Sequence, residues 1–283
     1  MPFANVFSIQ PTLSGGHRIT IEADLTKGIH AFTIVGLPDK AVEEARDRVS
    51  AAIKNSGYKS PKQRNQKITV ALAPASLKKE GPSFDLPIAL TYLLATGDIR
   101  FDPAGKIFVG ELALSGDVRA VRGALAIASA AKALGIKEIY VPSENAREAA
   151  LVSGVTVYPV GSLKELIAHL TTNKKGEVET AKITPQPETP LVDTKHVHTH
   201  SAWSDIRGQE SAKRGLMIAA SGGHNIAMWG PPGTGKTMLA KAFTELLPPL
   251  PEREALEVTA IHSVAGVLRG EIVVHPPMRA PHH

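Results

Sequence analysis

The sequence has 283 residues, which is long enough for about two domains that each bury a core. Its 43% hydrophobic and 21% charged residues are typical of a globular protein, and the absence of cysteine excludes disulfides, thiolate metal sites and cysteine nucleophiles. It has neither a long apolar stretch nor a signal peptide, so we expect a cytoplasmic protein with no membrane contact, and its net charge of +5 is compatible with an anionic partner.

Strand and helix patterns alternate through residues 1–170, which predicts one mixed domain. Apolar runs predict strands at 17–25, 31–39, 66–74, 106–114, 116–121, 137–142 and 155–160, with 106–114 and 116–121 paired as a hairpin. Helical periodicity predicts helices after Asp39 and at 84–97, 123–135 and 162–170. Asp39 is a suitable N-cap, and Ser162 and Glu165 have capping-box spacing. The first helix has an apolar stripe of Val42, Ala45, Val49, Ala52 and Ile53.

Residues 171–202 interrupt this pattern with three prolines and no apolar periodicity, so we interpret them as a linker. A second, α/β pattern occupies residues 203–283. It consists of a helix, a short strand at 224–229, a glycine-rich loop and a helix at 236–247.

The glycine-rich loop has the P-loop pattern, which is Gly230, Pro231, Pro232, Gly233, Thr234, Gly235, Lys236 and Thr237. Glycines let backbone N–H groups turn toward phosphate oxygens, and the helix that follows adds its dipole. We expect Lys236 to reach the β and γ phosphates of ATP, and Thr237 to be a Mg²⁺ ligand.

Hydrolysis also needs an acidic residue at the end of another strand to hold Mg²⁺, and a group that orients the attacking water. Neither is visible in the 47 residues that follow Lys236. We therefore interpret 203–283 as the first part of an ATPase domain in a truncated chain, which should bind nucleotide weakly or not at all and should not hydrolyse it.

A basic stretch from Lys54 to Lys79 contains no Asp or Glu and is the candidate contact for a polyanion. Its basic residues are Lys54, Lys59, Lys62, Arg64, Lys67, Lys78 and Lys79. A solvated basic face with no partner is the alternative.

Six segments together resemble the magnesium-chelatase-like AAA+ ATPases of the YifB/ComM type. They are 31–58, 68–90, 110–125, 205–240, 255–266 and 278–283. This resemblance implies a Lon-protease-like, ribosomal-S5-like α+β domain at 1–170, and the N-terminal portion of an AAA+ P-loop domain at 203–283.

Under this resemblance Ser83 aligns with the Lon nucleophile, and Ile127 stands where the catalytic lysine would be. A serine hydroxyl needs a base within hydrogen-bond reach, and isoleucine cannot accept a proton. Lys132 lies on the same predicted helix but about 140° away around it, which leaves Lys78 or Lys79 as possible substitutes. We therefore expect no peptidase activity and interpret Ser83 as a vestigial turn or helix-cap residue.

The resemblance further implies an ATPase that assembles into a hexameric ring and remodels single-stranded or branched DNA, as in branch migration during DNA uptake or recombination. The alternative is an ATP-driven chelatase-type or protein-remodelling subunit whose N-terminal domain binds protein. An ATP-dependent protease is the third reading, weakened by Ile127.

Residues 205–210 resemble the AAA+ segment that wraps adenine, with Ile206 and Gln209 as contacts. Trp203 and Trp229 could stack on a base, although Trp229 is better explained by packing beside the P-loop. His196, His198 and His200 alternate as a metal site would require, but they lie in the predicted linker. The family motif that contains Arg279, His282 and His283 has no role that we can derive.

Overall fold

The computed structural model describes residues 3–13, 15–171, 183–190, 202–268 and 272–279. The chain forms two compact units. The first comprises Met1–Pro190 with Ala260–Gly270, and the second comprises Leu191–Thr259 with Glu271–His283. In the ranges described, no helix is both long enough and apolar enough to cross a membrane.

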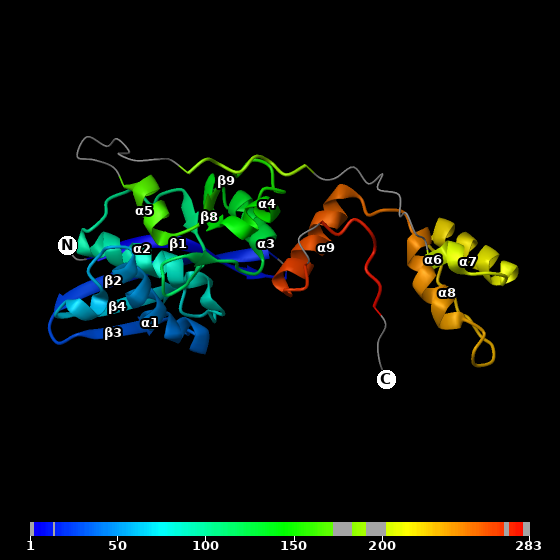
Figure 1. The fold of residues 1–283 in the computed structure, drawn as a ribbon, viewed down its shortest axis with the longest axis horizontal. Coiled ribbons are helices and arrows are strands. Elements are labelled where there is room, and N and C mark those ends of the chain that lie inside the picture. Colours follow the sequence, from blue (N-terminus) through cyan, green and yellow to red (C-terminus); the bar gives the residue numbers. More distant parts are fainter. Residues whose placement is uncertain (1–2, 14, 172–182, 191–201, 269–271, 280–283) are drawn as a thin grey trace. The chain divides into compact units, whose positions relative to one another are not determined.

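A four-stranded sheet forms one layer of the first unit (Figure 1). Its strands are β1 (Phe3–Thr12), β2 (Gly15–Lys27), β4 (Gln66–Ala73) and β3 (Ala31–Val35), in that spatial order. The β1–β2 and β2–β4 pairs are antiparallel, whereas β3 runs parallel to β4. Strand β1 was not predicted from the sequence. The other three strands confirm the predicted runs, with slightly different ends.

A second, three-stranded parallel sheet has the order β5 (Lys106–Phe108), β8 (Glu138–Pro142) and β9 (Thr156–Val160). The predicted hairpin of 106–114 with 116–121 is wrong in its extent, because only β6 (Glu111–Leu112) and β7 (Val118–Arg119) pair. Gly110 lies between β5 and β6, where the predicted strand is interrupted. The chain packs closely there, since a Cβ atom at Gly110 would lie 2.6 Å from a Val118 methyl carbon. The first half of the predicted strand instead pairs with β8.

Helices cover the sheets of the first unit and are α1 (Lys40–Asn55), α2 (Asp85–Thr96), α3 (Ala124–Ala133), α4 (Ala146–Ala149) and α5 (Leu163–Leu170). Shorter 3₁₀ turns occur at η1 (Pro61–Gln63), η2 (Pro82–Phe84) and η3 (Ser143–Asn145). The Asp39 N-cap is confirmed, since its carboxylate accepts the Val42 N–H at 2.8 Å. The Ser162 cap is confirmed in the same way, at 3.2 Å from the Glu165 nitrogen.

The predicted apolar stripe of α1 is confirmed, because all five of its residues are buried. They join one large core with residues of α2, the four-stranded sheet and α5. Helix α2 is buried on nearly every side and ends at Gly97, which has the left-handed conformation that favours glycine there.

Residues 183–190, which the sequence analysis places in the linker, lie along the first unit. The Gln186 N–H donates to the carbonyl oxygen of Val157 at 2.8 Å, and Ile183 is part of the core. Residues 172–182 and 191–201 are outside the described part of the chain, and so are His196, His198 and His200.

The described elements of the second unit are helical. They are α6 (Ala202–Asp205), α7 (Glu210–Gly222), α8 (Lys236–Phe243), η4 (Thr244–Leu246) and most of α9 (Glu252–Val264). The strand predicted at 224–229 is wrong, since these residues have no ladder hydrogen bonds. A strand needs a neighbour to pair with, and the described residues of this unit contain no other strand.

Candidate functional site

The loop before α8 has the backbone conformation of a phosphate cradle. Gly233 and Gly235 have φ angles of 80° and 84°, in the left-handed region that only glycine adopts easily. Helix α8 begins directly after Gly235, which makes no side-chain cap, so the backbone N–H groups of its first turn are available to an anion. This geometry fits the triphosphate of ATP.

Lys236 lies inside this loop. Its ammonium donates to the carbonyl oxygens of Gly230 at 2.8 Å and Pro231 at 2.7 Å. The Thr234 hydroxyl closes the same turn by donating to the Pro231 carbonyl at 3.0 Å. The positive charge is thus held within the loop whose N–H groups would surround a phosphate.

The Mg²⁺ requirement is met only in part by these residues. Thr237 is exposed in the first turn of α8 and offers one hydroxyl ligand. In the described ranges there is no group of three or more His, Cys, Asp or Glu side chains that could hold a metal ion. A magnesium ion here would therefore depend on Thr237, water and the phosphates.

The segment 205–210 is connected to the loop through Gln209. Its side-chain amide nitrogen lies 3.4 Å from the Thr234 carbonyl oxygen. The Ile206 side chain is 2% exposed and packs with Leu216, Leu239 and Ala242 beneath α8. Only the main chain of Ile206 could therefore face a bound adenine, whereas Gln209 is exposed beside the loop. Trp203 packs against the same cluster, and Trp229 is fully exposed rather than packed.

Neither Lys78 nor Lys79 forms a hydrogen bond to Ser83 among the described residues. Ser83 lies in η2, which packs against α1 and β6, whereas Ile127 is buried in α3, which packs on β1 and β2. The buried Lys79 ammonium donates to the Pro74 carbonyl, and burial lowers the pKa of Lys79. Lys78 is exposed and pairs with Glu80 at 2.9 Å, and that hydrogen bond raises the pKa of Lys78.

The basic stretch is not one uniform surface. Lys79 is fully buried and cannot contact a phosphate, which corrects its inclusion among the candidate DNA contacts. Three members have carboxylate partners: Lys62 with Asp47 at 2.7 Å, Arg64 with Asp98 at 2.6 Å, and Lys78 with Glu80.

The remaining members, Lys54, Lys59 and Lys67, are exposed and have no ion pair with a described residue. These three are therefore the best candidates for phosphate contact, with Lys62, Arg64 and Lys78 available only by exchange of partners.

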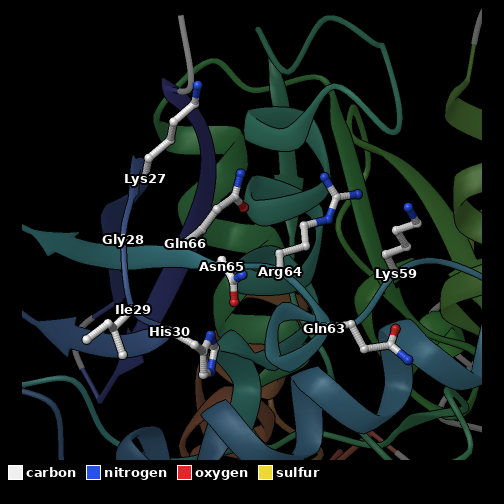
Figure 2. Close-up of a pocket in the computed structure, with 9 residues that line it drawn as sticks. All are labelled: Lys27, Gly28, Ile29, His30, Lys59, Gln63, Arg64, Asn65 and Gln66. Atoms are coloured by element: carbon white, nitrogen blue, oxygen red, sulfur yellow. The ribbon is translucent and has the colours of Figure 1, made fainter.

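A pocket that sequence reasoning did not identify lies at the end of the four-stranded sheet (Figure 2). Its lining is Lys27, Gly28, Ile29, His30, Lys59, Gln63, Arg64, Asn65 and Gln66. Only Lys59 and Arg64 belong to the basic stretch. The other residues could have been found only from the antiparallel register, which places Lys27 opposite Gln66.

Comparison with known proteins identifies the family. Residues 21–145 match the family "Subunit ChlI of Mg-chelatase", and residues 202–283 match the family "Magnesium chelatase, subunit ChlI". Together the two matches cover most of the chain. The second match includes the whole P-loop and the Gln209 segment.

Two relatives are similar over nearly the whole chain. The competence protein ComM of Haemophilus influenzae is 42% identical over 271 residues, which is 94% of this chain and 51% of ComM. The uncharacterized protein YifB of Escherichia coli is 43% identical over 267 residues, which is 94% of this chain and 50% of YifB. The chain belongs to this magnesium-chelatase-like family, and it spans about half the length of these relatives.

A more distant similarity covers part of the chain. A Lon protease of Leptospira interrogans is 29% identical over 160 residues, which is 55% of this chain and 19% of the protease. The fold of the chain is mixed α/β, with partial similarity to Lon.

Proposed function

We propose that this chain is the ATP-binding portion of an AAA+ ATPase that remodels DNA, and that its first unit has a Lon-like fold without peptidase activity. The observation that supports it most directly is the P-loop geometry: left-handed glycines, an uncapped α8 and Lys236 within the loop. Bound ATP with Mg²⁺ would supply the free energy of phosphoryl transfer. The chain's own groups would hold the phosphates.

Each residue of the site has a distinct part in this proposal. Lys236 would exchange its carbonyl partners for the β and γ phosphate oxygens, since a charge-assisted bond to phosphate is stronger than one to a carbonyl. Thr237 would hold Mg²⁺, and Gln209 would fix the segment beside the base. Turnover would need an acidic group that holds Mg²⁺ and an arginine that stabilises the transition state. We propose that this arginine comes from a neighbouring subunit in a ring.

The DNA role is supported by the exposed, unpaired Lys54, Lys59 and Lys67, together with the relationship to a competence protein. The second candidate is a chelatase-type or protein-remodelling subunit. The carboxylates that neutralise Lys62, Arg64 and Lys78 favour this reading, because they reduce the net attraction to phosphates.

Nucleotide binding is tested by the Lys236→Ala substitution, with Lys241→Ala on the same helix as a matched control. We expect weak but saturable binding of ATP with Mg²⁺ in calorimetric or NMR titration, weakened a further ~10- to 100-fold by Lys236→Ala, since a charged hydrogen bond contributes about 1.5–3 kcal/mol. Lys241→Ala should bind as the parent chain does. Equal affinity in all three proteins would contradict the assignment of the P-loop.

DNA binding is tested by titration of a labelled single strand and a forked duplex over a salt series. We expect affinity to fall steeply with salt, and the removal of Lys54, Lys59 and Lys67 together to reduce the slope by about 2 for single strands. A forked duplex that is not bound at low salt, with a protein partner bound instead, would favour the remodelling subunit. Because DNA and ATP are tested by separate variants, each half of the proposal can fail alone.

A further inference from the structure

The pocket at the end of the four-stranded sheet, which we call the β2–β4 pocket, is built by two loops. One loop connects β2 to β3 and contains Gly28, Ile29 and His30; the other leads from η1 into β4 and contains Arg64 and Asn65. The Gly28 N–H donates to the Asn65 carbonyl oxygen at 3.3 Å, so the two loops are joined. The cavity has a volume of about 940 Å³, at the upper end of the range of about 300–1,000 Å³ for small-ligand sites.

Positive charge lies at both ends of this pocket and polar groups lie between. In Figure 2 Lys27 and Lys59 are at opposite ends, with Gln66, Asn65 and Arg64 between them. Lys27 and Lys59 are exposed and form no ion pair with a described residue. The charge of Arg64 is paired with Asp98, so the two unpaired cations lie on either side of groups with little net charge, and they suit a ligand whose anionic groups flank a neutral one.

Three buried polar atoms of the lining lack a hydrogen-bond partner among the described residues. They are the Nδ1 atom of His30, the Nε atom of Arg64 and the Oε1 atom of Gln66. Buried groups of this kind are normally paired, and an unpaired group costs free energy. Arg64 uses its Nη2 atom to bind Asp98 at 2.6 Å, which fixes the guanidinium beside the pocket. The three unpaired atoms are buried beneath the pocket surface, so a ligand would meet the exposed side chains of the lining before it met these atoms.

An apolar side chain completes the lining. Ile29 is 94% exposed, in the same loop as His30. An exposed aliphatic side chain beside an imidazole offers a surface for the face of a flat, heteroaromatic ring.

We propose that the β2–β4 pocket holds one nucleotide of single-stranded nucleic acid, with the backbone phosphates at Lys27 and Lys59 and the base against Ile29, His30 and Gln66. This assignment rests on the proposed DNA function and states where and how the strand is held. A nucleotide combines anionic phosphates, which complement the two lysines, with a flat base, which the exposed Ile29 side chain and the His30 ring can cover. An acidic peptide offers carboxylates to the same lysines but no flat ring between them.

The test compares the 283-residue chain with variants on two labelled oligomers of equal length, one of thymidine nucleotides and one with abasic sites. The oligomers share a backbone and differ in their bases. We expect the parent chain to prefer the thymidine oligomer by ~5-fold or more per base held. The His30→Ala, Gln66→Ala double variant should lose this preference and keep its affinity for the abasic oligomer.

Lys27→Ala and Lys59→Ala should instead weaken binding of both oligomers. Lys137→Ala, at an exposed lysine outside the pocket, should change neither. A photoreactive 5-iodouracil oligomer should crosslink to the peptide that contains Ile29 and His30, which locates the base independently of any substitution.

The outcomes separate the two proposals. A parent preference for the thymidine oligomer that the double variant retains, with crosslinks elsewhere, overturns the pocket assignment and leaves DNA binding intact. Equal affinity of the parent chain for both oligomers would also overturn the pocket assignment and leave DNA binding intact, because the chain would then contact only phosphates. If neither oligomer binds at low salt, or if a poly-glutamate peptide competes as well as DNA does, both the pocket assignment and the DNA function are wrong.

Discussion

Arg48 and Asp85 form the most buried ion pair of the first unit's core that the structure describes. The Arg48 Nε and Nη2 atoms lie 2.6 and 3.0 Å from the two carboxylate oxygens, and the Leu112 N–H adds a bond at 3.2 Å. Asp85 is fully buried, so desolvation raises its pKa to about 6 in spite of these donors. The pair joins the middle of α1 to the start of α2 at the cost of a buried carboxylate.

Replacing Arg48 with Met should destabilise the protein in a pH-dependent way. The folded-state pKa of Asp85 already exceeds its unfolded value, and loss of the arginine raises the folded-state pKa further. The stability of the variant therefore falls as pH rises from the unfolded pKa to this raised folded-state pKa. We expect a loss of ~3–5 kcal/mol at about pH 8 and a smaller loss at about pH 5, where Asp85 can be protonated. Urea unfolding at both pH values measures the difference. A loss that is equal at both would mean that Asp85 is not the group left unpaired.

The sequence could predict the structural roles of residues whose contacts are local in the chain. The Asp39 and Ser162 caps and the stripe on α1 depend only on neighbours a few positions away, and all are confirmed. The P-loop glycines are likewise contiguous. In contrast, the Arg48–Asp85 pair and the β2–β4 pocket join residues that are distant in the chain, and no spacing rule indicated either.

At the scale of elements, the errors have one cause, which is that a strand is defined by its partner. Strand β1 was missed although it pairs with β2 along its whole length, whereas residues 224–229 look like a strand and have no partner in the described chain. Helices were more predictable, because their hydrogen bonds lie within the element.

The junction between β3 and α1 gives a sharp test of sheet packing at Gly36. Its φ angle is 107°, and a Cβ atom there would lie 2.2 Å from the Leu72 carbonyl oxygen on β4. Gly36→Ala must therefore displace the neighbouring backbone as well as accept a strained conformation. We expect a loss of stability well above the ~1–2 kcal/mol that the left-handed conformation alone costs.

Gly57→Ala is the matched control for this substitution. Gly57 also has a positive φ angle, 94°, but a Cβ atom there would have nothing within 4 Å. Thermal unfolding of both variants separates steric contact from conformational strain. Similar stability losses in the two variants would mean that β3 can move away from β4 without cost, and that the close approach at Leu72 does not hold the junction.

At the scale of the whole molecule, the two units differ in the size of their cores. The first unit buries a large cluster drawn from α1, α2, α5 and the four-stranded sheet, whereas the central cluster described in the second unit has four buried residues: Ile206, Leu216, Leu239 and Ala242. Stability rises with the fraction of surface that folding buries. The second unit is therefore expected to unfold at the lower temperature, and a ligand of its P-loop should stabilise it alone.

The aromatic residues allow each unit to be followed separately during unfolding. Both tryptophans, Trp203 and Trp229, belong to the second unit, whereas all four tyrosines, Tyr58, Tyr92, Tyr140 and Tyr158, belong to the first. We expect the tryptophan fluorescence transition to precede the tyrosine absorbance transition.

ATP with Mg²⁺ at 100 times its dissociation constant should stabilise only the second unit, which the tryptophan transition reports, by about 2.7 kcal/mol. At the same ATP concentration, Lys236→Ala should reduce this stabilisation to about 0.4–1.4 kcal/mol, and Lys241→Ala should retain it in full. Coincident transitions that move together with ATP would instead mean that the units unfold as one cooperative body, so that nucleotide at the P-loop is coupled to the surface proposed to hold DNA.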